Sequence, residues 1–168
     1  PRGRPGLFVD PHDFVWVGLH KPDEDELTRV EEVYGLHPLA LEDAFSAHQR
    51  PKLERYDDTL FLVLKTLWYV DEFDAVETGE INMFVGSNFV ISVRHGEGNA
   101  LHQARLELEG MQAVLKHGPS AVIYAVCDQV VDRYEEVAEC RVGGVAGVES
   151  SGFSGGRATD ARRSSRAQ

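Results

Sequence analysis

Carboxylate side chains are the residues of this chain that could bind a metal ion or transfer protons. The sequence has 28 Asp and Glu residues against 17 Lys and Arg, and its formal net charge is −11. Adjacent acids occur as Glu31 and Glu32, Asp57 and Asp58, and Glu135 and Glu136. Acids are also the usual residues of solvated faces, so these pairs predict solubility and an attraction for cations. A body this acidic repels nucleic acid, and we expect no nucleic-acid partner.

Histidine and cysteine are the other side chains that could serve a metal or a catalytic step. No two of the seven histidines lie four residues apart, the spacing that places two imidazoles on one metal along a helix. We expect His37 to begin a helix and His48 to be packed. Cys127 and Cys140 form no CxxC pair, which predicts neither a zinc site nor a disulfide framework and favours a reducing, cytosolic setting. Because the chain has no nucleophile elbow, phosphate loop or redox pair, we predict that it is not an enzyme.

Two helices are predicted after a short strand at residues 14–18. Acids at positions 23–26 suit the positive end of a helix dipole, and Gly35 is suited to end that helix. Pro38 predicts the first residue of a second helix, which runs to about residue 48. The inner face of the second helix is expected to carry Leu41, Ala44, Phe45 and His48, and its outer face Glu42, Asp43 and Ser46.

Residues 52–94 have the pattern of a β-sheet. The runs 52–56, 59–70, 76–85 and 89–94 are apolar or alternating, and turn-forming residues separate them. The continuous apolar run 60–64 predicts a strand buried on both faces, whereas Ile81, Met83 and Val85 alternate with other residues as in a half-exposed strand. The HQRPK segment before this sheet is interpreted as a structural connector between helix and strand. Helices are therefore expected on both sides of the sheet.

Two more helices are predicted at residues 99–116 and 119–139, with Gly118 and Pro119 as the break between them. The second is amphipathic. Its apolar stripe holds Val122, Val126, Val130, Tyr134 and Val137, and the opposite side holds Asp128, Asp132 and Glu135.

The last part of the chain, residues 141–168, is rich in Gly, Ser, Ala and Arg and has almost no periodic apolar face. This composition predicts disorder. We therefore divide the chain into a folded domain at 1–140 and a disordered tail at 141–168. No run of about 20 apolar residues, the length that a membrane-spanning helix needs, occurs in the sequence.

One long run of residues resembles a known family. The segment YGLHPLALEDAFSAHQRPKLERYDDTLFLVLKT, residues 34–66, is similar to the cytoplasmic domain of the CorA family of magnesium and cobalt transporters, and INMFVGSNFVISVRHGE and AVIYAVCDQVVDRY continue the likeness in order. The resemblance implies an α+β fold class: an α/β/α sandwich with a mixed, mainly antiparallel sheet covered by helices on both faces. It also implies a stalk and a homopentameric pore of two transmembrane helices per subunit. The pore signature Gly-Met-Asn does not occur in this chain.

The resemblance further implies metal-binding residues. The family's regulatory magnesium sites lie between neighbouring cytoplasmic domains, and their carboxylates map onto Glu42, Asp43 and Asp128. Exposed carboxylates at such a seam suit weak binding of Mg²⁺, a hard cation that keeps much of its water, with Co²⁺ as a second candidate ion. The expected function is a cytoplasmic domain that senses divalent cations and gates a cell-membrane channel built from identical subunits. Without the resemblance, the three acids indicate only a solvated helix face.

Other interpretations remain open at this stage. The chain could be a stand-alone soluble binding module or an inactive fragment without a transport role. It could also be a relative that moves zinc. The tail has the composition of out-of-frame translation, so a truncated or frameshifted family member is a further hypothesis. Membrane contact is expected only through C-terminal helices that this chain lacks, and the chain as given is expected to be soluble and cytoplasmic.

Overall fold

The computed structural model describes the backbone of residues 13–155 and the side-chain surroundings of residues 13–140. Five strands and five α-helices occur in this part of the chain. The strands are β1 (Val15–His20), β2 (Lys52–Tyr56), β3 (Thr59–Val70), β4 (Ala75–Val85) and β5 (Phe89–His95). The helices are α1 (Glu24–Tyr34), α2 (Pro38–Ser46), α3 (Ala100–Gly110), α4 (Gln112–Leu115) and α5 (Pro119–Gly155), and a 3₁₀ turn η1 (Asp71–Phe73) joins β3 to β4.

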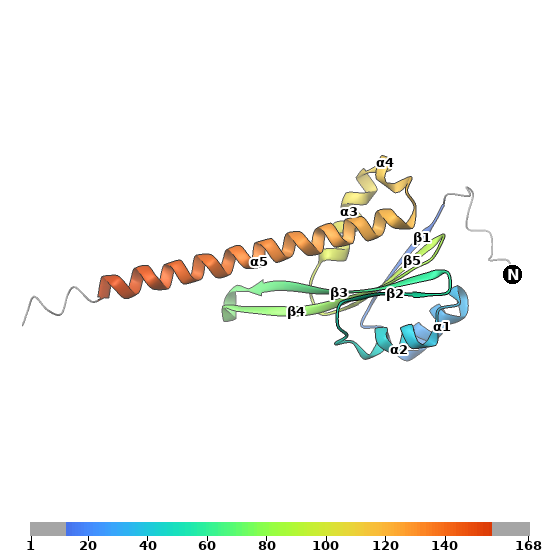
Figure 1. The fold of residues 1–168 in the computed structure, drawn as a ribbon, viewed down its shortest axis with the longest axis horizontal. Coiled ribbons are helices and arrows are strands. Elements are labelled where there is room, and N and C mark those ends of the chain that lie inside the picture. Colours follow the sequence, from blue (N-terminus) through green and yellow to red (C-terminus); the bar gives the residue numbers. More distant parts are fainter. Residues whose placement is uncertain (1–12, 156–168) are drawn as a thin grey trace, which may run out of the picture.

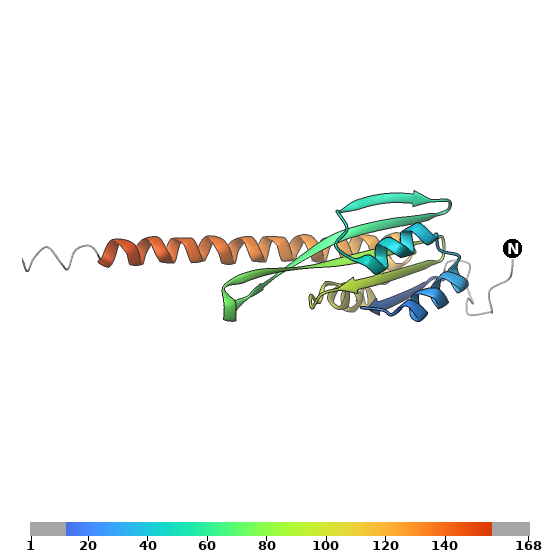
Figure 2. The same ribbon diagram turned by 90° about the horizontal axis from the view of Figure 1, so that it is seen from below.

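The five strands form one mixed sheet in the order β1-β5-β4-β3-β2. β1 pairs with β5 in parallel, and the other neighbours are antiparallel. Helices α1 and α2 lie on one side of the sheet, and α3 and α5 lie on the other (Figures 1 and 2). The structure therefore confirms the predicted α+β sandwich with helices on both faces.

Each face of the sheet has its own hydrophobic core. On one face, the side chains of Ile81, Met83 and Val85 pack against α3 and α5. On the other, Phe61 and Phe84 pack against α1 and α2, with their ring centroids 4.9 Å apart. This division follows from the two-residue period of a strand, which sends neighbouring side chains to opposite faces.

Strand β4 differs from its predicted half-exposed form, because its last six residues are buried on both faces. Met83 is 0% exposed, and so is Asn82 beside it on the opposite face. Glu80 is 2% exposed, and its carboxylate accepts bonds from Lys65 Nζ at 2.6 Å and from Asn82 Nδ2 at 2.9 Å. The Glu80 carboxylate thus has partners from the sheet, whereas the buried Oδ1 of Asn82 has no hydrogen-bond partner among the described residues.

Helix α2 is shorter than predicted and presents a different inner face. It ends at Ser46, because Ala47 and His48 adopt left-handed backbone conformations with φ of 50° and 62°. Ala40 takes the inner position expected for Phe45, whose side chain is 51% exposed, and His48 is exposed rather than packed.

The helices after the sheet also depart from the predicted boundaries. The helix expected over residues 99–116 is divided at Met111 into α3 and α4. Helix α5 begins at Pro119 as predicted but continues without a break to Gly155 and projects far beyond the sheet (Figure 1). The structure thus has helix over residues 141–155, where the composition predicted disorder. Residues 156–168 lie outside the described part of the chain.

Candidate functional site

Helix α2 positions two of the three predicted metal-binding carboxylates. His37 begins the helix as predicted, since its Nδ1 accepts a hydrogen bond from the Leu39 N–H at 3.2 Å. Ala40, Leu41 and Ala44 are buried against the sheet. The 3.6-residue period then turns Glu42 to solvent, while the Asp43 side chain lies at the edge of the helix and is 27% exposed.

Asp43 already has a cationic partner, Lys52 of β2. Lys52 Nζ lies 2.6 Å from Asp43 Oδ2 and 2.8 Å from Glu54 Oε2. The bonds to Asp43 and then to Glu54 raise the pKa of the Lys52 ammonium, and the same contact with Lys52, helped by the Tyr56 hydroxyl, lowers the pKa of Glu54. These contacts tie α2 to the edge of the sheet, so the HQRPK segment has the structural role that its sequence predicted.

Replacing Lys52 tests whether its ion pairs stabilise the contact between α2 and β2. Lys52→Met keeps an apolar stem beside the Phe61 ring, which lies 5.5 Å from Nζ, but leaves Asp43 and Glu54 without the cation. A half-exposed ion pair contributes at most about 1 kcal/mol, so a small fall in the urea-unfolding midpoint at pH 7 is expected. A Lys21→Met control, whose pair with Glu97 is exposed on both sides, should leave the midpoint unchanged.

The difference between wild type and Lys52→Met should also depend on pH. The pKa of Glu54 is lower in the folded state, so its contribution is present above its unfolded pKa and is lost as the pH falls through the folded one. The raised pKa of Lys52 keeps its own contribution intact until the solution is strongly alkaline. Unfolding curves at pH 3 and pH 7 should therefore show a smaller difference at pH 3. An equal difference at both pH values would contradict the assigned ion pair.

The third predicted carboxylate, Asp128, lies on the exposed side of α5. Val122, Val126 and Val130 hold the opposite side of that helix in the core, as the amphipathic pattern predicted. Tyr124 and Val131, four residues before Asp128 and three after it, share its exposed stripe and are 62% and 52% exposed. Asp128 therefore lies on the solvent side of α5, between two exposed side chains of the same stripe.

A single chain does not bring the three acids together. Glu42 and Asp43 belong to α2, on one side of the sheet, and Asp128 belongs to α5, on the other side (Figure 1). Within residues 13–140, no three His, Cys, Asp or Glu side chains are grouped so that they could hold a metal ion. A metal site made from these residues needs a second copy of the chain, so the intersubunit site stays a prediction.

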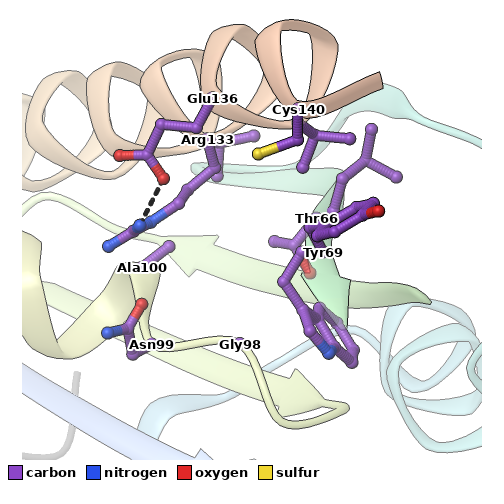
Figure 3. Close-up of a pocket in the computed structure, with 12 residues that line it drawn as sticks. Thr66, Tyr69, Gly98, Asn99, Ala100, Arg133, Glu136 and Cys140 are labelled. Atoms are coloured by element: carbon purple, nitrogen blue, oxygen red, sulfur yellow. Dashed lines mark hydrogen bonds and ion pairs between the residues drawn. The ribbon is translucent and has the colours of Figure 1, made fainter. Parts of the chain in front are cut away.

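A small cavity of about 180 Å³ marks the place where α5 leaves the sheet. Its walls come from β3, from the segment 98–100 and from α5, and Figure 3 shows Arg133 directed toward Glu136 with Cys140 on the next turn of the helix. The Tyr134 hydroxyl donates to the Lys65 carbonyl oxygen, and burial raises the pKa of this phenol. These contacts join helix α5 to strand β3.

The architecture defines a class of protein: a mixed α/β/α sandwich with a long helix that projects from it. A soluble domain of CorA from Methanocaldococcus jannaschii has this fold, with a TM-score of 0.70 at 13% identity over 83% of this chain and 55% of that one. Residues 11–140 match the family of CorA-like Mg²⁺ transporter proteins. The chain belongs to this family, as the resemblance indicated.

Two curated relatives are similar over the same region. YfjQ of Bacillus subtilis is 34% identical over 121 residues, which is 72% of this chain and 37% of that protein. The cobalt/magnesium transport protein CorA of Thermotoga maritima is 29% identical over 131 residues, which is 76% of this chain and again 37% of the relative. The chain thus spans little more than a third of the relatives that it matches. Among the described residues, no helix is long and apolar enough to cross a membrane.

Proposed function

We propose that this chain is the cytoplasmic regulatory domain of a transporter for Mg²⁺ and Co²⁺, and that it works beside identical copies in a homopentamer. The observation that carries the proposal is the family match over residues 11–140. The long helix α5 supports it, because it begins inside the domain and continues past the sheet. The domain itself would regulate, and the pore would be formed by other parts of the intact transporter.

Helix α5 is the element that would carry a signal out of the domain. Val122, Val126 and Val130 fix its first turns to the sheet and to α3. At 1.5 Å per residue, its 37 residues extend over about 55 Å. A helix held at one end moves as a rod when its domain rotates, so a small change of packing between neighbouring domains would displace its far end.

Glu42, Asp43 and Asp128 would supply the oxygen ligands for the sensed ion where two copies meet. Glu42 and Asp128 are exposed, so they are accessible to a hydrated Mg²⁺ ion and to a neighbouring copy. Asp43 is available only when it exchanges Lys52 for the metal, which further weakens binding. Weak binding is suited to an ion that is present at millimolar concentration. An ion that bridges two domains favours the arrangement in which the domains are in contact.

The test is made in an intact transporter that contains this domain. Asp128→Asn removes the charge but keeps the shape of the side chain. Inhibition of the current by cytoplasmic Mg²⁺ is expected to need several-fold more Mg²⁺, since each lost charge-assisted ligand weakens the bridged state. Glu109→Gln on α3, another exposed acid, serves as the control and should leave the inhibition curve unchanged. Equal curves for wild type and Asp128→Asn would reject Asp128 as a sensing residue.

A further inference from the structure

A second pocket, of about 410 Å³, lies between β1, β5 and the beginning of α3. Four of its lining residues carry basic side chains: His20, Arg94, His102 and Arg105. Within the described part of the chain, no Asp or Glu lines this pocket. A concentration of basic groups in a protein of net charge −11 is not explained by overall composition. It points to a local preference for negative charge.

The floor of the pocket is held by buried hydrogen bonds. Ser92, which is 1% exposed, accepts from the Trp16 indole N–H at 3.0 Å and donates to the Val17 carbonyl oxygen at 3.3 Å. Gly18 beside it has no side chain to fill the space, and a Cβ placed there would meet the Ser92 hydroxyl only at 3.7 Å. The pocket is therefore a fixed feature of the β1–β5 pair. Gly18 keeps it open, although the backbone at this position does not have the positive φ that favours glycine.

Each of the two guanidinium groups in the pocket is held by one hydrogen bond to a backbone carbonyl and has further N–H donors. Arg94 Nη1 donates to the Gly98 carbonyl oxygen. Arg105 Nη2 donates to the Trp16 carbonyl oxygen at 2.7 Å, and the Arg105 guanidinium lies 4.9 Å from the centre of the Trp16 ring. A guanidinium has five N–H donors in a planar fork that matches the oxygens of a phosphate. Each arginine is thus oriented by one bond and keeps donors for a ligand.

The backbone adds to this positive potential. The 11-residue helix α3 begins at the pocket, and its first residue is preceded by Asn99, whose side chain makes no capping hydrogen bond. The positive end of the helix dipole and the N–H groups of the first turn favour an anion there. Glu97, which follows β5, is outside the lining of the pocket, and its carboxylate pairs with Lys21 Nζ at 2.9 Å.

We propose that this pocket binds a small phosphate-bearing anion, either free phosphate or the phosphate group of a nucleotide. The phosphate oxygens would accept from Arg94 and Arg105, and the start of α3 would complete the set of donors. The pocket lies on a different set of residues from Glu42, Asp43 and Asp128, so this binding does not depend on the proposed sensing of metal ions.

Titration calorimetry on the whole 168-residue chain tests the proposal, in EDTA so that Mg²⁺ does not complex the ligand. The probes are inorganic phosphate, adenosine triphosphate and adenosine. We expect saturable binding of phosphate or of the nucleotide, and none of adenosine. The stronger of the two phosphate probes then identifies the source of the anion. Raising the salt concentration should weaken this binding, because the contact is between charges.

Three variants distinguish a specific anion-binding site from nonspecific attraction of anions to the protein surface. Arg94→Gln is expected to weaken binding at least tenfold, since a charge-assisted bond is lost. Gly18→Val places a side chain in the pocket at a position where an added Cβ meets only the Ser92 hydroxyl, at 3.7 Å, and it should weaken binding to a similar extent. An unchanged urea midpoint is expected to show that the variant keeps its fold. Arg55→Gln removes an exposed arginine of β2 and should change affinity less than twofold. No saturable binding by the wild type, or equal losses in Arg94→Gln and Arg55→Gln, would overturn the proposal.

Discussion

Truncating Phe84 to alanine is expected to remove about 3–5 kcal/mol of folding stability. Phe84 is 1% exposed on β4, and its ring packs at 4.9 Å from the Phe61 ring, between the sheet and helices α1 and α2. Both the transfer of the ring from water and the cavity left behind contribute to the loss. Domains of this kind have a total stability of about 5–15 kcal/mol, so this variant should lie near the edge of folding.

Urea unfolding followed by circular dichroism measures the effect. Phe73→Ala is the matched control, because Phe73 carries the same side chain but is 69% exposed in the turn between β3 and β4. A change within about 0.5 kcal/mol is expected for the control. If the two substitutions lower the free energy of unfolding by the same amount, the assignment of Phe84 to a tightly packed core is wrong.

The sheet could be predicted closely from the sequence because its strands are separated by unambiguous turn residues. The run 59–70 coincides with β3, and the break at Asp57 and Asp58 coincides with the turn before it. Burial of β4 could not be predicted, because Glu80 and Asn82 have the appearance of a solvent face. Only the sheet order places β4 between β3 and β5, with Lys65 opposite Glu80, and this order depends on contacts between residues far apart in sequence.

The ends of the helices show a similar limit. Gly35 ends α1 as predicted, with φ of 66°, because glycine alone favours that conformation. Ala47 and His48 adopt positive φ angles without being glycine, so no local signal indicated that α2 ends at Ser46. Phe45 lies within α2 and is exposed because the helix buries Ala40, Leu41 and Ala44 instead. The extension of α5 past residue 140 was not predicted because the segment is rich in glycine and serine, which lower helix stability without excluding a helix.

For the candidate site, the sequence predicted which carboxylates are exposed better than it predicted which side chains they contact. Glu42 and Asp128 are exposed on helices, as the amphipathic patterns indicated. The pairing of Asp43 with Lys52 needs the chain to turn back between α2 and β2, so residues nine positions apart meet only in the folded state. The basic pocket was missed because its side chains come from β1, β5 and α3, and no short segment of sequence contains them.

The buried carboxylate of Glu80 provides the second large effect. Glu80→Ala would leave the Lys65 ammonium without its partner at 2.6 Å and would remove the acceptor of the Asn82 amide, whose own Oδ1 already lacks a partner among the described atoms. Breaking a buried pair costs about 3–5 kcal/mol, and the lower end applies because the Lys65 side chain is 32% exposed and can reach water. Urea unfolding should therefore show a loss of about 3 kcal/mol.

The consequence should extend to α2, since Glu80 lies opposite His95, whose Nε2 lies 2.7 Å from the Ala44 carbonyl oxygen near the end of that helix. Hydrogen exchange of α2 amides should become faster in Glu80→Ala than in Glu77→Ala, an exposed acid on the same strand. The double variant Glu80→Leu with Lys65→Met should recover much of the stability, because apolar residues can replace a buried ion pair. Equal stability of Glu80→Ala and Glu77→Ala would show that this pair does not support the helix that carries Glu42 and Asp43.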